Sequence, residues 1–355
     1  MNDAAGESQT SAIPEIPEIP VAPKERGWWR VVVATLLFLF VPMTPVLRIV
    51  LPVDQTFVLL APALAACAVA GWWFGGRIPL AVLWIGLASW VLYTFTAGGS
   101  QFSFLVCGWA VLLTAAFASL VIFSKKESSR PFSIQAFTAI GLALVFAAGA
   151  AAVMKQRAVS LPSLIVAEAS KRSEESLAEW RQTTSSKEWS DLFAGNADAK
   201  SIAATMESQL QAAPAEAADL FPSLLALESL IALAIAWAVY HRIGRERIGP
   251  PLAALRDFRF SDQFVWGLVA GLAMVVLPGF AGLTVLGANL LVFFGALYAL
   301  RGIGVGLWFL SPGRVFMGFL IVFAVVFPIV LGVLGVGLGV GDTWLNWRAR
   351  GEPKT

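Results

Sequence analysis

Residues 102–123 read FSFLVCGWAVLLTAAFASLVIF, a run of 22 residues without one charged side chain. An α-helix needs about 20 such residues to cross the roughly 30 Å hydrocarbon core of a bilayer. A helix also satisfies its own backbone hydrogen bonds, which lipid cannot do. The run therefore predicts a membrane-spanning helix.

Eight further stretches approach this length and composition, so we expect an all-α polytopic membrane protein with a bundle of nine transmembrane helices. The expected spans are residues 31–51, 57–74, 78–96, 102–123, 133–154, 222–243, 263–280, 284–309 and 315–340. Two of them, 57–74 and 263–280, are short. A re-entrant segment in place of either would leave eight spans and move the C-terminus to the other side.

The composition of the whole chain agrees with this fold class. Of its 355 residues, 58% are hydrophobic and 14% charged, against roughly 45–50% and about 25% in soluble domains. A soluble globular protein is excluded. The net charge of +2 gives no reason to expect a nucleic-acid partner, so membrane lipids are the expected surroundings. With two cysteines and one histidine, we expect no disulfide framework, no metal site and no cofactor.

The chain divides into five parts. Residues 1–27 form a polar, Pro-rich arm with the repeat Ile-Pro-Glu, typical of polyproline II; it is either a solvated tail or a segment that a partner protein binds. Residues 28–154 hold five spans, 222–345 hold four, and 346–355 form a polar tail. Between the two groups of spans, residues 155–221 form a helical insert, with helices expected at 163–182 and 198–213. Ile202, Met206 and Leu210 lie four residues apart and predict one apolar stripe on the second helix.

Basic residues predict the orientation, because short loops rich in Lys and Arg stay in the cytoplasm. A cytoplasmic N-terminus places such residues in every inner loop, and none in the short outer loops. We therefore expect a bacterial cytoplasmic (inner) membrane protein with an extracytoplasmic insert, which carries 10 acidic and 5 basic residues from 163 to 219. Nine spans, however, place Arg348, Arg350 and Lys354 outside, against the same rule.

Ionisable residues within spans are the first candidates for function, because each costs roughly 2.5–3.5 kcal/mol on insertion scales. Glu228 lies about two turns into the sixth expected span, at a depth similar to that of Asn289 in the eighth. If the two helices are neighbours, this carboxylate and amide would meet and bind a cation or a polar group of a ligand. The alternatives are a packing contact or a side chain that reaches the interface.

Two arginines are further candidates. Arg301, near the inner end of the eighth span, either reaches the interface or is a buried cation paired with Asp257 or Asp262. Arg48 follows Pro42 and Pro45, and broken spans are where transporters place binding sites. The alternative for Arg48 is a kinked helix with an interfacial arginine.

No pattern predicts catalysis. The sequence Gly339-Val340-Gly341-Asp342 matches the G-x-G-D pattern of intramembrane aspartyl proteases, which need two facing carboxylates. No second aspartate occurs in an expected span. We therefore expect no catalytic residues and do not expect an enzyme.

Several short motifs after residue 220 carry a family resemblance. They are residues 221–225 (FPSLL), 240–247 (YHRIGRER), Pro250 with Pro251, Tyr298 with Arg301 and Gly302, and Asp342 with Trp344 and Arg348. Together they resemble the YybS-like family of bacterial multi-spanning membrane proteins. The resemblance implies a distant similarity to the substrate-capture subunits of energy-coupling-factor transporters. It also implies that Tyr298, Gly302, Asp342, Trp344 and Arg348 form a structural motif.

Two functions follow as hypotheses. The favoured one is a transport or small-molecule-binding membrane protein that uses Glu228, Asn289, Arg301 and Arg48. The alternative is a membrane scaffold or assembly factor that recruits protein partners through its N-terminal arm or its helical insert.

Overall fold

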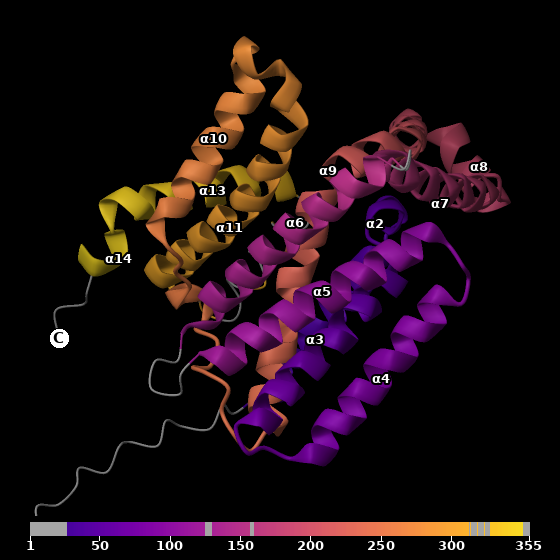
Figure 1. Cartoon of the computed structure of the whole chain (residues 1–355). Helices are drawn as coiled ribbons and strands as arrows, with labels where there is room; N and C mark the ends of the chain where they lie inside the picture. Colours follow the sequence, from indigo (N-terminus) through magenta and orange to yellow (C-terminus); the bar gives the residue numbers. More distant parts are fainter. Residues whose placement is uncertain are drawn as a thin grey trace, which may run out of the picture.

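A computed structural model describes residues 27–124, 130–156, 160–311 and 327–350, together with residues 313, 318 and 323. The helices form a bundle from which α7 and α8 project at one end (Figure 1). They are α1 (Trp28–Phe40), α2 (Pro45–Val50), α3 (Val53–Trp73), α4 (Ile78–Thr96), α5 (Gln101–Phe123), α6 (Phe132–Gln156), α7 (Leu161–Thr184), α8 (Lys187–Gly195), α9 (Ala197–Ile243), α10 (Val265–Val276), α11 (Thr284–Leu310), α13 (Pro328–Leu345) and α14 (Trp347–Arg350). Four short 3₁₀ segments are η1 (Val41–Met43), η2 (Leu255–Asp257), η3 (Asp262–Phe264) and η4 (Pro278–Leu283).

The fold class is confirmed: among the described residues there are only helices and connections, and no strand. In the described part of the chain, six helical segments are long and apolar enough to cross a membrane, and three further apolar helices are shorter. The nine expected spans thus correspond to six long and three short helical segments. The expected span 263–280 reduces to the 12 residues of α10, and the first part of the expected span 315–340 lies outside the described residues.

Proline explains the short first segment. Pro42 and Pro45 have no backbone N–H to donate and restrict the preceding residue, and the expected span 31–51 is accordingly divided into α1, η1 and α2. Thr44, between the two prolines, has an extended backbone.

The insert and the sixth expected span share one helix. α9 runs for 47 residues, with Pro214 and Pro222 inside it, and so continues across the boundary at residue 221. Its start is capped by Asn196, whose side chain accepts hydrogen bonds from the backbone N–H groups of Asp198 and Ala199. α7 packs beside the first half of α9. Of the predicted stripe, Leu210 is fully buried, whereas Ile202 is exposed.

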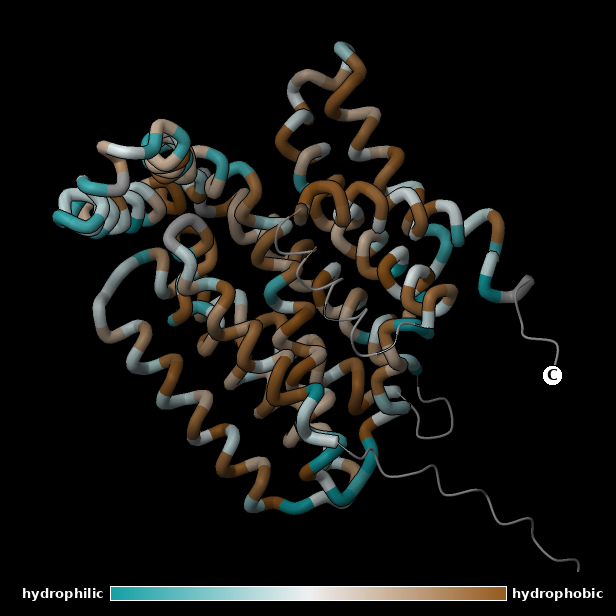
Figure 2. The backbone as a smooth tube through the Cα atoms, turned by 180° about the vertical axis from the view of Figure 1, so that it is seen from behind, coloured by the Kyte–Doolittle hydropathy of each residue, from teal (hydrophilic) through white to brown (hydrophobic). Residues whose placement is uncertain are grey.

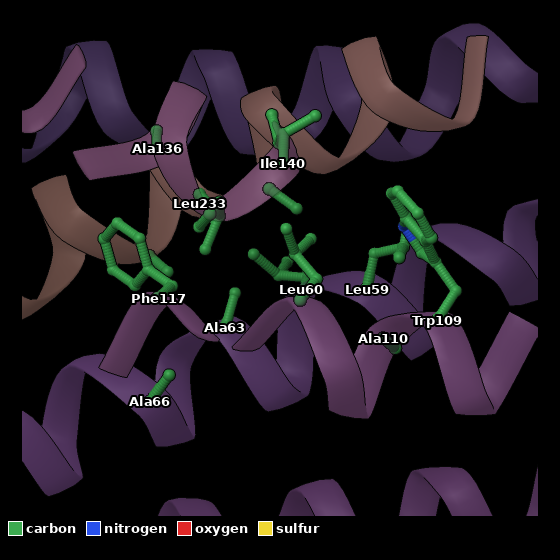
Figure 3. Packing of buried hydrophobic residues seen from close by; sticks show 14 of the residues in the cluster. Leu59, Leu60, Ala63, Ala66, Trp109, Ala110, Phe117, Ala136, Ile140 and Leu233 are labelled. Carbon is green, nitrogen blue, oxygen red and sulfur yellow. The ribbon is translucent and has the colours of Figure 1, made fainter. Parts of the chain in front are cut away.

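The hydrophobic core lies where α3, α5, α6 and α9 meet. Leu60 and Ala63 of α3 face Phe117 of α5, Ile140 of α6 and Leu233 of α9 in Figure 3. Hydrophilic residues gather on α7 and α8 and at the opposite end of the bundle (Figure 2). We call the first the insert end. The other, which holds residues 74–77 and 244–264, is the loop end.

Glycines bring α11 and α13 into close contact near the loop end. A Cβ atom added to Gly302 would overlap the carbonyl oxygen of Gly335, and one added to Gly339 would overlap that of Tyr298. Small residues allow helices in a membrane to approach each other's backbones in this way. Gly302 of α11 and Gly335 and Gly339 of α13 therefore belong to a helix-packing surface.

Candidate functional site

A buried polar pair lies inside the bundle near the insert end. Gln55, in the first turn of α3, donates a hydrogen bond from Nε2 to Oε2 of Glu228 on α9, at 2.6 Å. Both side chains are buried, Gln55 completely. The carboxylate that the sequence singles out is thus removed from the surface and held by an amide from another helix.

A second polar contact adjoins this pair. Trp109 of α5 donates its indole N–H to the hydroxyl of Ser229 at 2.9 Å, and this contact is also buried. Ser229 follows Glu228 directly on α9. Three helices, α3, α5 and α9, therefore contribute polar groups to one region of the interior.

Two oxygen atoms of this region remain unpaired. Oε1 of Gln55 and Oε1 of Glu228 are buried and have no hydrogen-bond partner in the described part of the chain. A buried polar atom without a partner costs about 1–3 kcal/mol. Most buried polar atoms in proteins therefore have a hydrogen-bond partner. Because both atoms are acceptors, the region is complementary to a group that brings hydrogen-bond donors or positive charge.

Asn289 does not meet Glu228, which corrects the sequence-based hypothesis. Its Oδ1 accepts a hydrogen bond from the backbone N–H of Ser223 at 2.9 Å, and its Nδ2 donates to the carbonyl oxygen of Asp219 at 2.6 Å. In an uninterrupted helix these two backbone groups would pair with each other, but Pro222 lies between them. Asn289 therefore bridges a break in α9, and its amide is used up by that role.

Arg48 also has a structural role, because it joins α2 to α7. Its guanidinium donates to Glu179 at 2.8 Å and to Ser176 at 3.2 Å, both on α7. The Glu179 side chain is 65% exposed, so this arginine lies at the surface of the insert end. Of the two alternatives for Arg48, the structure therefore favours a kinked helix with a surface arginine over a binding site in a broken span.

Next to it, Arg172 of α7 attaches the insert to the bundle. It pairs with Glu168 at 2.9 Å, and its guanidinium lies 4.8 Å from the ring centre of Phe102 on α5. Burial lowers the pKa of Arg172, and the Glu168 carboxylate partly offsets this effect. The contact with Phe102 and the Arg48 contacts join α7 to the bundle, whereas the pair with Glu168 lies within α7.

At the loop end, Arg301 is the centre of a charge network. It donates from Nε to Asp342 of α13 at 2.9 Å and from Nη1 to Asp262 at 2.7 Å. Of the two sequence-based alternatives for Arg301, the buried cation is therefore correct, with Asp262 as one partner. Asp342 also accepts a hydrogen bond from Arg348 at 2.7 Å. The side chains of Asp342 and both arginines are almost fully buried, whereas that of Asp262 is 62% exposed.

Most of the expected C-terminal motif gathers around this network. Tyr298 is fully buried, and its ring lies 5.0 Å from that of Phe260, which also contacts the Arg301 guanidinium. Gly302 allows the close approach of α13. Trp344 is the exception, because its side chain is 68% exposed.

Arg348 also places the C-terminal segment. It donates to the backbone carbonyl oxygens of Arg256 and Phe258 at 2.9 and 3.2 Å, so α14 lies at the loop end beside the basic loop that follows α9. Nine full crossings would have put it at the insert end. The conflict with the distribution of basic residues thus disappears for Arg348; Lys354 lies outside the described residues, as do residues 1–26 of the N-terminal arm.

Sequence reasoning missed Gln55 and the Trp109–Ser229 contact. A glutamine in the first turn of an expected span is a weak signal, because the sequence does not say which helix it faces. Within the described residues, no group of three or more His, Cys, Asp or Glu side chains is arranged to hold a metal ion.

The family model described as "Predicted membrane protein (DUF2232)" matches residues 31–343. The chain belongs to this family. No curated protein and no solved structure matches it. The family match covers the bundle, the insert and three members of the charge network, Asp262, Arg301 and Asp342, whereas Arg348 lies beyond it.

Proposed function

We propose that this membrane protein binds, and moves across the membrane, a small solute that carries hydrogen-bond donors, such as an amine. The observation that carries the proposal is the pair of buried, unpaired acceptor atoms on Gln55 and Glu228. Within a membrane such a pair is costly to maintain, and a ligand that supplies donors would offset the cost.

The pair is suited to binding rather than to catalysis. Glu228 supplies a carboxylate that accepts hydrogen bonds, and Gln55 orients this carboxylate through the bond at 2.6 Å. Polar groups deep within a helical bundle are typical of solute pathways in transporters. The YybS-like assignment and the similarity to substrate-capture subunits stay predictions. If they hold, a separate motor subunit would supply the energy.

The test is the thermal unfolding of the purified full-length protein in detergent, with a panel of small amines, amino acids and polyols. We expect at least one amine to raise the unfolding temperature of the wild type. Glu228→Gln should abolish this rise, because it removes the charge and leaves an amide that can still pair with Gln55.

The matched control is Gln135→Leu. Gln135 is also a buried glutamine with an unpaired Oε1, but it lies on α6 at the loop end. The control should retain the full response to the amine. The proposal fails if no compound in the panel stabilises the wild type, a result that would favour the scaffold hypothesis, or if Glu228→Gln responds as the wild type does.

For the orientation, we propose that the loop end faces the bacterial cytoplasm. Arg77, Arg130, Arg242, Arg245, Arg247, Arg256 and Arg259 belong to the loops or helix ends there, and Arg348 joins them. Because basic loops are retained in the cytoplasm, the insert would then be extracytoplasmic. Alkaline phosphatase fused after residue 355 should be inactive, and the same enzyme inserted between α7 and α8 should be active.

A further inference from the structure

A groove of about 480 Å³ lies at the loop end, separate from the Gln55–Glu228 pair. It runs between the first turns of α6 and the segment that leads into α10. The residues that line it are Pro131, Ser133, Ile134, Phe137, Thr138, Arg259, Phe260, Ser261 and Phe264. Its volume is within the range of about 300–1,000 Å³ found for sites that hold small molecules.

The wall of the groove is aromatic and aliphatic. Phe137 contacts Phe264 edge to face, with ring centres 5.2 Å apart, and Phe260 stacks on Phe264 at 5.8 Å. Ile134, on the open side, is 49% exposed. Such a surface favours a hydrocarbon chain.

The rim of the groove is polar and cationic. Arg259 is exposed, and no ion-pair partner is found for it in the part of the chain that the structure describes. Ser133 and Ser261 line the same groove. Ser133 belongs to the first turn of α6, whose N–H groups at Ile134 and Gln135 donate to the carbonyl oxygen of Pro131, so Arg259 and the two serines are what the rim offers to an anion. These groups together are complementary to a phosphate.

The position in the membrane suits an amphiphile with both parts. α6 is a candidate span that begins at Phe132, so residues 131–138 lie where the headgroups meet the hydrocarbon. From the charge of the rim, the apolar wall and this depth, we propose that the groove is a binding site for an anionic phospholipid. Its phosphate lies at Arg259 and Ser133, and its acyl chain lies along Ile134 and Phe137.

The proposal is tested on the full-length protein in nonionic detergent, by titrating phosphatidylglycerol and following the thermal unfolding midpoint. Binding should stabilise the protein, because Phe260 connects the groove to Tyr298 and Arg301. Arg259→Gln should raise the lipid concentration for half-maximal stabilisation about five-fold, since one basic residue near an anionic membrane contributes about that factor. Ile134→Trp, at a half-exposed position, should weaken binding by filling the groove.

Three controls decide the outcome. Arg77→Gln removes another exposed arginine at the loop end, directly before α4, and should leave the titration unchanged. Phosphatidylcholine and inorganic phosphate should each stabilise the wild type less than phosphatidylglycerol does. The proposal is overturned if Arg77→Gln weakens binding as much as Arg259→Gln, if phosphatidylcholine is equally effective, or if phosphate alone gives the full effect.

Discussion

The two ends of the bundle differ in how a buried carboxylate is paired. At the loop end, the carboxylate of Asp342 is bound by Arg301 and Arg348, and Arg301 has a second partner in Asp262. At the insert end, Gln55 and Glu228 share one hydrogen bond and each leaves an acceptor unpaired. Both regions lie on helices that the sequence marks as apolar, so burial alone does not distinguish them.

This difference indicates that the Asp342 network has a structural role and that the Gln55–Glu228 pair has a functional one. A network whose charges are all paired stabilises one arrangement of helices and offers nothing to a ligand. A pair with unpaired acceptors is incomplete without a ligand. We therefore expect substitutions of Asp342 and its arginine partners to change stability, and substitutions of Gln55 and Glu228 to change ligand binding.

The largest effect on stability is expected from Asp342→Asn. It would leave Arg301 and Arg348 buried without their shared anion, and removal of one member of a buried ion pair costs about 3–5 kcal/mol. The free energy of unfolding, measured with sodium dodecyl sulfate in mixed micelles, should fall by this amount.

The control for that variant is Asp262→Asn. Asp262 binds the same arginine, but its side chain is 62% exposed, and Arg301 keeps Asp342 as a partner without it, so the loss should be smaller, about 1 kcal/mol. Equal losses from the two variants would show that the burial of Asp342 does not increase its contribution to stability. The network would then not be what stabilises this arrangement of helices.

A smaller loss is expected from Gly302→Ala, which tests the contact that brings the network together. The added methyl group would overlap the backbone of Gly335 and push α13 away from α11, at about 1–3 kcal/mol for an overpacked site. Gly306→Ala is the matched control on the same helix, because a Cβ atom there meets nothing within 4 Å. It should be neutral or slightly stabilising, as the same unfolding measurement would show; a similar loss from both would refute the close-packing explanation.

Next in size is Asn289→Ala, at the insert end. It would leave the N–H of Ser223 and the carbonyl oxygen of Asp219 without their bridging amide, which should cost about 1–2 kcal/mol. Hydrogen exchange at Ser223 should also become faster. The control is Thr284→Val, which removes a local hydrogen bond from the Thr284 hydroxyl to the carbonyl oxygen of Ala281. It should leave the exchange rate at Ser223 unchanged. An unchanged rate in Asn289→Ala itself would contradict the bridging role.

The sequence was sufficient for the fold class, because the spacing and length of apolar stretches follow directly from the thickness of a bilayer. It was less reliable where helices break or merge. Pro42 lies just after the end of α1 and Pro45 begins α2, whereas Pro214 and Pro222 lie inside α9. The difference depends on what replaces the lost backbone hydrogen bond, and at Pro222 the replacement is Asn289, 66 residues after Ser223.

The candidate site was predictable only in part for a related reason. Glu228 and Arg301 stand out because a charge within a span is costly wherever it lies. Their partners could not be read in the same way. Asp262 was expected as a partner of Arg301, because both lie toward the same end of the bundle. That Glu228 pairs with Gln55 and not with Asn289 depends on which faces of α3, α9 and α11 meet.

The smallest stability effect is expected from the double variant Gln55→Leu with Glu228→Leu, and it sharpens the comparison most. Replacing both partners of a buried polar pair with apolar groups of similar size is often neutral, so the free energy of unfolding should stay within about 1 kcal/mol of the wild type. Glu228→Leu alone should cost more, about 1–3 kcal/mol, because it leaves the amide of Gln55 unpaired. The double variant should nevertheless lose all stabilisation by the amine. If the double variant lost as much stability as Asp342→Asn, the Gln55–Glu228 pair would have a structural role like that of the Asp342 network.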